Sequence, residues 1–392
     1  MREHWLLDAA VTYLNHGTVG ATPRAVLAAQ QALQVEIERR PAQFMLRELA
    51  SVRVGMPRPE PPRMRVAAAV VAEFLGARAE DLVFVENTTT GVNAVLRSLP
   101  LAPGDEILMT DLTYGGVANA ARFVARQTGA VARAVEMPDP ACGPAAVVEA
   151  VAAGIGERTR LAIVDHITAE SALLLPLAEI AARCRARGVP VLADGAHAPG
   201  AIAVDIPALG VDWYVGNLHK WAWAPRSSGI LWAPAERHAD LHPTVISWGL
   251  DQGLTAEFDM LGTRDPTQHL AAPAALALMR ELGVDAVRSY NHDLVWRAAH
   301  RLAERWGVPF ATPESMIGTM ATLPLPQPLG STREDAARLR DALLFEDAIE
   351  VQVHAWKGRL RVRVSAQIYN DIGDFDRLGA AIARRSGRAE MR

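Results

Sequence analysis

Short, wholly apolar runs alternate with helix-like segments through the first half of the chain. Leu82–Glu86 (LVFVE) and Pro190–Asp194 (PVLAD) are apolar up to their last residue, whereas a strand with one wet face would alternate apolar and polar residues. Repeated strand–helix units with doubly buried strands predict a mainly parallel sheet covered by helices on both faces. The expected elements are strands at 82–86, 106–110, 132–137, 160–165 and 190–194 and helices at 88–98, 116–128, 145–154 and 177–188.

The pattern changes after about residue 265, where helices and a few strands predict a smaller α+β domain joined to the first by a long helix. We therefore expect a large domain over residues 15–262 and a small domain made of residues 1–14 and 263–392. The other expected elements are helices within 65–76, 270–306 and 333–343, strands at 320–325 and 359–364, and a loop over the Arg/Pro-rich stretch 52–64.

Composition and charge exclude several classes of protein. The 392 residues carry 40 Lys and Arg against 44 Asp and Glu, and a net charge of −4 gives no reason to expect nucleic-acid or anionic-membrane binding. The first 12 residues are too short and too charged for a signal peptide, and no run approaches the roughly 18 apolar residues that cross a bilayer. Two cysteines cannot build a disulfide framework or a structural zinc site. We expect a cytoplasmic protein without a metal centre.

Polar residues gather where three predicted strands end, which is where open α/β sheets bind ligands. The first such point is Glu86–Gly91 (ENTTTG), where a strand runs directly into a helix. The unpaired N–H groups, the hydroxyls of Thr88 and Thr89 and the positive end of the helix dipole suit a phosphate. A plain Asn or Thr cap of the helix is the alternative interpretation.

The second point is Leu192–His197 (LADGAH). A carboxylate at the end of a buried strand, without a neighbouring lysine, is costly unless it meets a positive or hydrogen-bonding partner. A protonated pyridine nitrogen, a metal ion or a ribose hydroxyl would serve Asp194 in this way. A turn-capping aspartate is the structural alternative.

The third point is Trp213–Trp221 (WYVGNLHKW), in which Lys220 follows a short β-like run. Lys220 follows a histidine and lies among aromatic residues, so we do not expect a solvated surface lysine. A desolvated lysine has a lowered pKa and attacks carbonyl groups. An isolated lysine would not support this interpretation, but the three points occur together and in order, each at a strand end.

These residues carry a resemblance to a known family. Asp194-x-x-His197, followed 23 residues later by Lys220 within Asn-Leu-His-Lys, resembles the class V aminotransferase superfamily, which also holds the cysteine desulfurases. The resemblance extends over residues 12–385 and implies a PLP-dependent transferase of fold type I, with an α/β large domain, a smaller α+β C-terminal domain and pyridoxal 5′-phosphate (PLP) as cofactor. Further matching segments are 13–17 (YLNHG), 88–90 and 363–370, and segments 165–168 (DHIT) and 262–266 (GTRDP) are most similar to the isopenicillin N epimerase-like branch.

The resemblance implies a role in holding PLP for each matching residue. Lys220 would form the Schiff base (the internal aldimine) and then carry the Cα proton, and Asp194 would pair with the pyridinium nitrogen. His197 would lie near the 3′-oxygen, and Tyr114 would stack on the ring, with strand-end packing as its alternative. The residues implied to hold phosphate are Thr88, Thr89, Asn217 and His219, together with Thr263, which would reach the phosphate of the neighbouring subunit in a homodimer.

Other matching residues would contact the substrate. Arg363 would clamp the substrate carboxylate with its planar fork, and Arg361 would either share that task or flank it. Asn15 and His16 would lie near the substrate, with a structural hydrogen bond as the alternative for His16. Arg264 would meet either the distal part of the substrate or the dimer partner.

Two departures from the family pattern bear on the reaction. The loop at 350–358, where cysteine desulfurases carry a nucleophilic cysteine, has none and instead contains His354 and Trp356. Persulfide chemistry on the enzyme is therefore not expected. Residues 169–171 (AES) also differ from the Ser-Pro-Thr usual in this branch, which leaves the substrate open.

We expect an enzyme that acts at Cα of a small amino-acid-type substrate through Lys220, as in isopenicillin N epimerase-like proteins. A C–S lyase acting on a cysteine- or sulfoxide-derived substrate, or an aminotransferase, is the alternative, because all of these reactions begin by breaking a bond at Cα. An inactive binding protein that kept the fold is disfavoured, because Asp194, His219, Lys220 and Arg363 are all present.

Overall fold

The computed structural model describes residues 1–50, 52 and 60–387. Most of the loop predicted over 52–64 lies outside the described residues. Buried apolar side chains gather in separate clusters on the two faces of a large central sheet and in a second, smaller part of the molecule.

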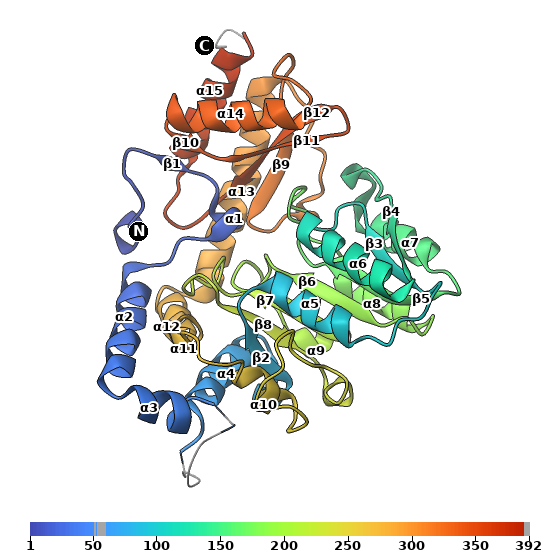
Figure 1. Ribbon diagram of the computed structural model, residues 1–392. Coiled ribbons are helices and arrows are strands. Elements are labelled where there is room, and N and C mark those ends of the chain that lie inside the picture. The colour runs from blue at the N-terminus through green and yellow to red at the C-terminus, as the bar shows by residue number, and fades with distance from the viewer. Residues whose placement is uncertain (51, 53–59, 388–392) are drawn as a thin grey trace.

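A seven-stranded sheet forms the centre of the larger part (Figure 1). The strand order is β2-β8-β7-β6-β5-β3-β4, in which β8 is antiparallel to β2 and β7 and the remaining neighbours are parallel. The mainly parallel sheet is confirmed, whereas the four-residue strand β8 was not among the predicted elements. The strands are β2 (Leu82–Val85), β3 (Glu106–Thr110), β4 (Val131–Val135), β5 (Thr159–Asp165), β6 (Val191–Gly195), β7 (Trp213–Asn217) and β8 (Gly229–Trp232).

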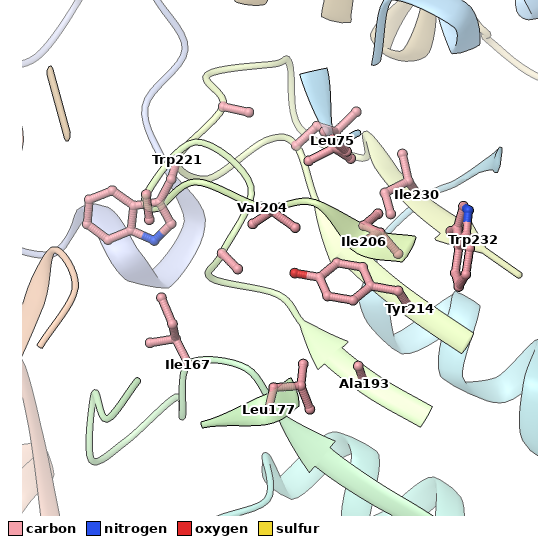
Figure 2. Packing of buried hydrophobic residues seen from close by; sticks show 14 of the residues in the cluster. Leu75, Ile167, Leu177, Ala193, Val204, Ile206, Tyr214, Trp221, Ile230 and Trp232 are labelled. Carbon is pink, nitrogen blue, oxygen red and sulfur yellow. The ribbon is translucent and has the colours of Figure 1, made fainter. Parts of the chain in front are cut away.

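Helices cover both faces of this sheet, as the unbroken apolar strands predict. Phe84 of β2 belongs to the core on one face, and the next residue, Val85, belongs to the core on the other. Figure 2 shows Tyr214, Ile206 and Ile230 packed on the first of these faces. The first face is covered by α4 (Arg63–Phe74), α7 (Gly143–Gly154) and α8 (Leu177–Arg185), and the second by α5 (Thr88–Ser98), α6 (Gly115–Thr128) and α10 (Leu254–Asp259).

The smaller part is built on an antiparallel sheet of order β11-β12-β9. Its apolar core includes Val353, Val362 and Phe375. The N-terminal segment joins this part, because β1 pairs in parallel with β10. The predicted α+β character is confirmed. The elements are β1 (Thr12–Tyr13), β9 (Met320–Pro324), β10 (Ile349–Glu350), β11 (Gln352–Trp356), β12 (Arg359–Ser365), α13 (Val284–Trp306), α14 (Arg333–Phe345) and α15 (Ile372–Arg385).

The long helix α13 connects the two parts (Figure 1). Before it, α12 packs against α4 and adds Leu276 and Met279 to the core of the larger part, whereas Leu294 of α13 belongs to the core of the smaller part. The division of the chain at residue 262 stays a proposal. Within α13, the buried side chains pass from the core of the larger part to the core of the smaller part. The remaining helices are α1 (His16–Val19), α2 (Arg24–Arg39), α3 (Pro41–Gln43), α9 (Ile206–Leu209), α11 (Thr267–Leu270) and α12 (Ala272–Glu281).

Most predicted elements are observed with ends shifted by a few residues. α4 begins at Arg63 rather than at 65, because Pro62 stands at its N-cap with φ −58° and ψ 140°, outside the helical region. The helical stretch predicted over 270–306 is divided by Gly283, whose φ of 83° no helix accommodates. Across the described residues, we find no helix that combines the length and the apolarity needed to cross a bilayer.

Candidate active site

A cavity of about 360 Å³ lies at the carboxyl ends of the central strands and is closed on its other side by β11 and β12. Because β3, β5, β6 and β7 run in the same direction, their ends meet at one edge of the sheet. The structure thus gathers residues that are far apart in the sequence, and their individual roles stay predictions. The predicted site residues that line the cavity are Thr88, Thr89, Tyr114, Asp194, His197, Asn217, His219, Lys220 and Arg363.

Lys220 lies three residues beyond β7, with most of its side chain buried. Burial, together with the charge of Arg363 and against that of Asp194, lowers the pKa of Lys220 to about 7. Much of the amine is therefore uncharged at neutral pH, which is the nucleophilic form. Lys220 is also one of only two lysines in the sequence, and the other, Lys357, is exposed and pairs with Glu136. This scarcity is a signal for Lys220 that the motif analysis did not use.

His197 contacts the lysine amine, with its Nε2 at 3.3 Å from Lys220 Nζ. Its Nδ1 accepts a long hydrogen bond of 3.5 Å from Trp221 Nε1, so the neutral ring carries its proton on Nε2. Burial, with the neighbouring positive charges, holds the pKa of His197 well below its usual range. An Nε2–H directed at Lys220 matches an uncharged amine, because an ammonium has no lone pair to accept the hydrogen bond.

Two buried carboxyl groups lie side by side at the ends of adjacent strands. Asp165 of β5 and Asp194 of β6 are paired directly in the strand register. Burial raises the pKa of Asp194 to about 6, against a 2.9 Å hydrogen bond from the Ala196 amide. Burial and the charge of Asp194 raise the pKa of Asp165 well above its usual range, and its Oδ2 has no hydrogen-bond partner. A cationic group bound beside this pair would be stabilised.

Sequence analysis did not assign a role to Asp165. Its position at the end of an apolar run is the same signal that selected Asp194. The pairing of the two carboxyls depends on the register of β5 against β6, which the separate strand patterns do not determine.

The N-terminus of α5 opens onto the cavity. Asn87 caps the helix by accepting a 3.0 Å hydrogen bond from the Thr90 amide, so neither Thr88 nor Thr89 is needed as a cap. The Thr88 amide donates to Asn217 Oδ1 at 3.0 Å, whereas the buried Thr88 hydroxyl has no partner. A buried, unsatisfied hydroxyl at the positive end of a helix suits a phosphate group.

His219 lines the cavity, and of its two ring nitrogens only Nδ1 forms a hydrogen bond with a described residue. Its Nδ1 donates to the carbonyl of Ser228 at 2.9 Å, and burial lowers the pKa of His219 to about 4. An anion bound at Nε2 would raise this pKa and turn Nε2 into a donor. Trp223 and Ser227, in the loop that follows, have φ values of 61° and 65°, which are strained for residues other than glycine. Such strain is typical of functional loops.

The N-terminal segment supports the lysine loop from behind. His16 Nε2 donates to the carbonyl of Lys220 at 3.0 Å, and Nδ1 accepts from the Tyr369 hydroxyl at 2.8 Å. His16 is fully buried and does not line the cavity, so the geometry favours its structural alternative. At Gly20, φ is 71° and a Cβ would lie 2.0 Å from the His219 carbonyl oxygen. Only glycine permits this close approach.

Strand β12 carries Arg363 into the cavity from the opposite side. Its guanidinium donates to the Ala169 carbonyl, to Thr18 Oγ1 at 2.7 Å and, more weakly, to Asn15 Oδ1 at 3.4 Å. Between described residues it has no carboxylate partner, its Nε is unpaired, and burial lowers its pKa to about 10. A buried guanidinium without a counter-charge favours binding of a carboxylate. Asn15 positions this guanidinium and does not itself line the cavity.

Two further predicted residues, besides Asn15 and His16, lie outside the cavity. Thr263 is exposed, in keeping with a role at a neighbouring subunit's site, which stays a prediction. Arg264 forms an ion pair with Glu86 of the same chain, the residue just before the N-cap of α5. This ion pair therefore stabilises the start of α5, a role for Arg264 that sequence analysis did not propose.

The region predicted as a loop at 350–358 is a strand, β11, followed by a tight turn, and this corrects the prediction. The segment pairs with β12, so its side chains take alternating directions and His354 faces the cavity. Burial lowers the pKa of His354 to about 3, its Nε2 has no partner, and its Nδ1 lies 4.0 Å from Glu170 Oε1. Glu170 and Gln352 also line the cavity and were not among the predicted residues.

Comparison with known proteins adds the family. The model of the family described as aminotransferase class-V matches residues 62–340. Isopenicillin N epimerase of Streptomyces clavuligerus is 32% identical over 98% of this chain and 98% of its own. A probable chloroplastic L-cysteine desulfhydrase of Arabidopsis thaliana is 30% identical over 96% of this chain and 83% of its own.

Solved structures share the fold along almost the whole chain. The cystine C–S lyase C-DES, in complex with its product cysteine persulfide, has a TM-score of 0.76 and 25% identity, covering 96% of this chain and 98% of its own. A C-DES variant with glycine covalently linked to its PLP cofactor has a TM-score of 0.78 and 24% identity over 98% and 99% of the two chains.

The groups that line the cavity fit PLP. The Thr88 hydroxyl at the start of α5 suits its phosphate, the buried carboxyl pair at Asp194 suits a pyridinium nitrogen, and the uncharged amine of Lys220 suits its aldehyde. The predicted family, fold class and cofactor are confirmed. By its sequence, its fold and the groups at its sheet edge, the chain belongs to the class V aminotransferase family of PLP-dependent enzymes.

Proposed function

We propose that this enzyme inverts the configuration at the α-carbon of an amino-acid-type substrate, as isopenicillin N epimerase-like proteins do. The observation that carries the proposal is the placement of two proton-bearing side chains on either side of the buried carboxyl pair. In the order of the sheet, β7 leads to Lys220, β6 and β5 end in Asp194 and Asp165, and β3 leads to Tyr114. Inversion needs one group to remove the α-proton and another to return it from the other side.

When bound, PLP supplies an electron-withdrawing ring that stabilises negative charge at the substrate α-carbon. Asp194 would hold the ring nitrogen, and its ionised form would be stabilised there by the positive charge that it meets. Thr88 and His219 would hold the phosphate, and His197 would lie near the 3′-oxygen. These residues would hold the cofactor at the carboxyl ends of the strands.

Lys220 and Tyr114 would move the proton. A pKa of about 7 allows Lys220 to accept the α-proton at neutral pH and to release it again. His197 directs its Nε2–H towards the amine and so holds it in place. Tyr114 is 48% exposed, so its hydroxyl can exchange protons with solvent and supply one from the side opposite Lys220.

Arg363 would fix the substrate by its α-carboxylate. Its unpaired Nε leaves room for a bidentate contact, because Glu170, whose charge acts on Arg363, forms no ion pair with it. Thr18, Asn15 and the Ala169 carbonyl hold the guanidinium in place. This contact limits rotation of the substrate and therefore sets which bond at Cα faces Lys220.

A C–S lyase is the second candidate, supported by the similarity to L-cysteine desulfhydrases and to the cystine lyase. Both reactions begin with the same loss of the α-proton and differ in what leaves next. Neither cysteine of this chain lines the cavity: Cys142 is exposed in a loop, and Cys184 is buried in α8. A lyase built on this chain would therefore release its sulfur product directly. Aminotransfer is the third possibility.

The products formed in D₂O distinguish these reactions. The holoenzyme is incubated with single L-amino acids, and Cα deuteration, chirality and keto-acid formation are measured. The proposal expects the D-enantiomer with solvent deuterium at Cα, and Tyr114→Phe should slow inversion more than it slows deuteration of the L-enantiomer. Equal amounts of keto acid, ammonia and thiol would replace the epimerase assignment by a lyase. A lasting pyridoxamine form would indicate an aminotransferase, and no exchange across a broad panel would refute the proposal.

We further propose that the enzyme is a cytoplasmic homodimer in which Thr263 reaches the partner's phosphate site. Thr263 is exposed, and the nearby loop exposes Val245, Ile246 and Trp248, the last of these by 79%. Contiguous exposed apolar side chains favour a protein interface. Sedimentation equilibrium of the holoenzyme tests the dimer, and a monomer at micromolar concentration would contradict it.

A further inference from the structure

A second chamber, of about 270 Å³, adjoins the cofactor cavity. Tyr114, Glu170 and His354 line both spaces and form the boundary between them. A substrate held at its α-carbon beside Lys220 has this chamber open to its side chain. The chamber walls come from the end of β3, the loop after β5 and the sheet of the smaller part, so they combine residues of both parts of the molecule.

Strand β12 places one guanidinium in each space. Arg363 lines the cofactor cavity, and Arg361 lines the second chamber. Residues two apart on a strand point to the same face, and their α-carbons lie roughly 6.6 Å apart. Arg361 is paired across the sheet with His354, at the boundary of the two spaces. The two arginines can therefore bind two separate anionic groups of a single extended molecule.

Arg361 is held in position but forms no ion pair with a described residue. Its guanidinium carbon lies 4.2 Å from the centre of the Trp356 ring, a stacking contact that limits its movement. Its Nε is buried without a hydrogen-bond partner among the described residues. Burial lowers its pKa, against the charge of Asp139. An oriented and unpaired guanidinium is suited to bidentate binding of a carboxylate.

The charged side chains that line the chamber, Arg361 included, leave an excess of one positive charge; Asp139, which acts on Arg361, is not one of the lining residues. The positive side chains are Arg122, Arg333 and Arg361, and the acidic ones are Asp111 and Glu170. Asp111 already accepts a 2.9 Å hydrogen bond from the Met137 amide. Because Glu170 stands at the boundary, a second negative group is favoured beyond it, on the side of Arg361.

We propose that this chamber is the side-chain subsite and that Arg361 binds a distal carboxylate of the substrate. The substrate class is then a long, unbranched α-amino acid or its derivative with an anionic group at the far end. The inference rests on the proposed function, because it requires Arg363 to hold the α-carboxylate while the side chain crosses the boundary at Tyr114 and Glu170. It assigns to Arg361 a task separate from that of Arg363.

The test compares amino acids that differ only at the far end. The holoenzyme is titrated with L-glutamate, L-2-aminoadipate, L-2-aminopimelate, L-norleucine and L-lysine, and both the cofactor absorption and Cα deuteration in D₂O are followed. We expect half-saturation for the best dicarboxylate to be roughly 10- to 100-fold lower than for norleucine, the range of a charge-assisted hydrogen bond. Arg361→Gln should remove most of this ratio, and Arg361→Lys should restore part of it.

A matched control separates this effect from a general loss of positive charge. Arg183→Gln removes an exposed arginine on α8, paired with Glu149, and should leave the ratio unchanged. Retained cofactor absorption and thermal unfolding confirm that each variant is folded.

Each outcome of this comparison is decisive. If norleucine is deuterated at Cα and its half-saturation is close to that of the best dicarboxylate, the subsite proposal is wrong and the proposed function stands. Equal weakening of all substrates by Arg361→Gln would assign Arg361 to the α-carboxylate instead. No exchange or spectral change with any amino acid would refute the proposed function, and the subsite with it.

Discussion

The two walls of the active site differ in how they are built. The sheet wall consists of strand ends and a helix N-terminus and contains Lys220, Asp194 and Thr88. The facing wall is a pair of antiparallel strands whose side chains include His354, Arg361 and Arg363. The first wall presents groups that are uncharged or that share protons, whereas the second presents two guanidinium groups that form no ion pair with a described residue.

This difference separates cofactor binding from substrate choice. The positions of the groups on the sheet wall are set by strand ends and by a helix N-terminus, which belong to the fold itself. Such fixed positions suit a ligand of fixed shape. The groups of the facing wall are side chains on a hairpin, and a substitution there changes specificity without altering the sheet. We therefore expect changes in the sheet wall to affect the chemical step and changes in the facing wall to affect substrate affinity.

The largest effect is expected at Lys220. Lys220→Ala removes the amine that would bind PLP and move the α-proton, and turnover should fall at least about 10³-fold. Steady-state assays measure this loss, and borohydride reduction of the wild-type holoenzyme followed by peptide mapping should label the Lys220 peptide. Lys357→Ala, at the only other lysine, is the matched control. Normal turnover of Lys220→Ala, or a label at Lys357, would disprove the central assignment.

A smaller loss of rate is expected at Asp194. Asp194→Asn keeps the shape of the side chain but removes the charge that stabilises a protonated ring nitrogen, and Cα–H cleavage should slow by roughly 10²- to 10³-fold. The rate of Cα deuteration at saturating substrate reports this step. Asp212→Asn, at a strand start remote from the cavity lining, is the control. Near-normal deuteration would show that another residue holds the nitrogen.

On the facing wall, Arg363→Gln should act mainly on substrate affinity. Loss of a charge-assisted contact should raise KM by roughly 10- to 100-fold, with a lesser effect on kcat and none on retention of PLP. Initial rates over a range of substrate concentrations, together with the cofactor absorption of the resting enzyme, measure the three quantities. Unchanged kinetics would place the carboxylate clamp elsewhere, and loss of PLP would remove the distinction between the two walls.

Sequence analysis predicted the sheet wall better than the facing wall, for a physical reason. Asp194 and Lys220 each follow an apolar run within a short, contiguous segment, so the local pattern predicts both the burial and the position of the side chain. The parallel sheet follows from the same runs. The short strand β8 was missed because its four residues begin with a glycine and lie between Ser228 and Pro234, a composition typical of a loop.

The properties that sequence analysis missed arise from contacts between distant segments. The pairing of Asp165 with Asp194 depends on strand register. For His16 the structural hydrogen bond was one of two predicted alternatives, and the choice between them depends on Tyr369, which lies 353 positions away in the sequence. That Arg361 lies in a different chamber from Arg363 depends on how β12 packs near the end of β3, which the sequence of β12 does not reveal. Local patterns contain no information about these contacts.

Asp194, on the sheet wall, should also affect the free energy of unfolding of the protein without PLP. Burial raises the pKa of Asp194 to about 6, above its value in an unfolded chain, so ionisation of Asp194 opposes folding once the pH rises above about 4 and does so fully above about 6. Apo Asp194→Asn should therefore be more stable than wild type by about 1–3 kcal/mol at pH 8, and the difference should shrink towards pH 5. Urea unfolding at the two pH values measures this, and a difference that grows at lower pH would contradict it.

The smallest expected effect concerns the buried hydroxyl of Thr88, and it should change sign with the cofactor. In the apoprotein this hydroxyl has no partner, so Thr88→Val should leave stability unchanged or raise it slightly. In the holoenzyme the same change should weaken PLP retention by roughly 5- to 10-fold, because a phosphate contact worth about 1 kcal/mol is lost. PLP titration and thermal unfolding of both forms give the two values. Thr90→Val, at a hydroxyl on the same helix that contacts Asn87 instead, is the control, and a destabilised Thr88→Val apoprotein would mean that the fold, rather than the cofactor, requires this hydroxyl.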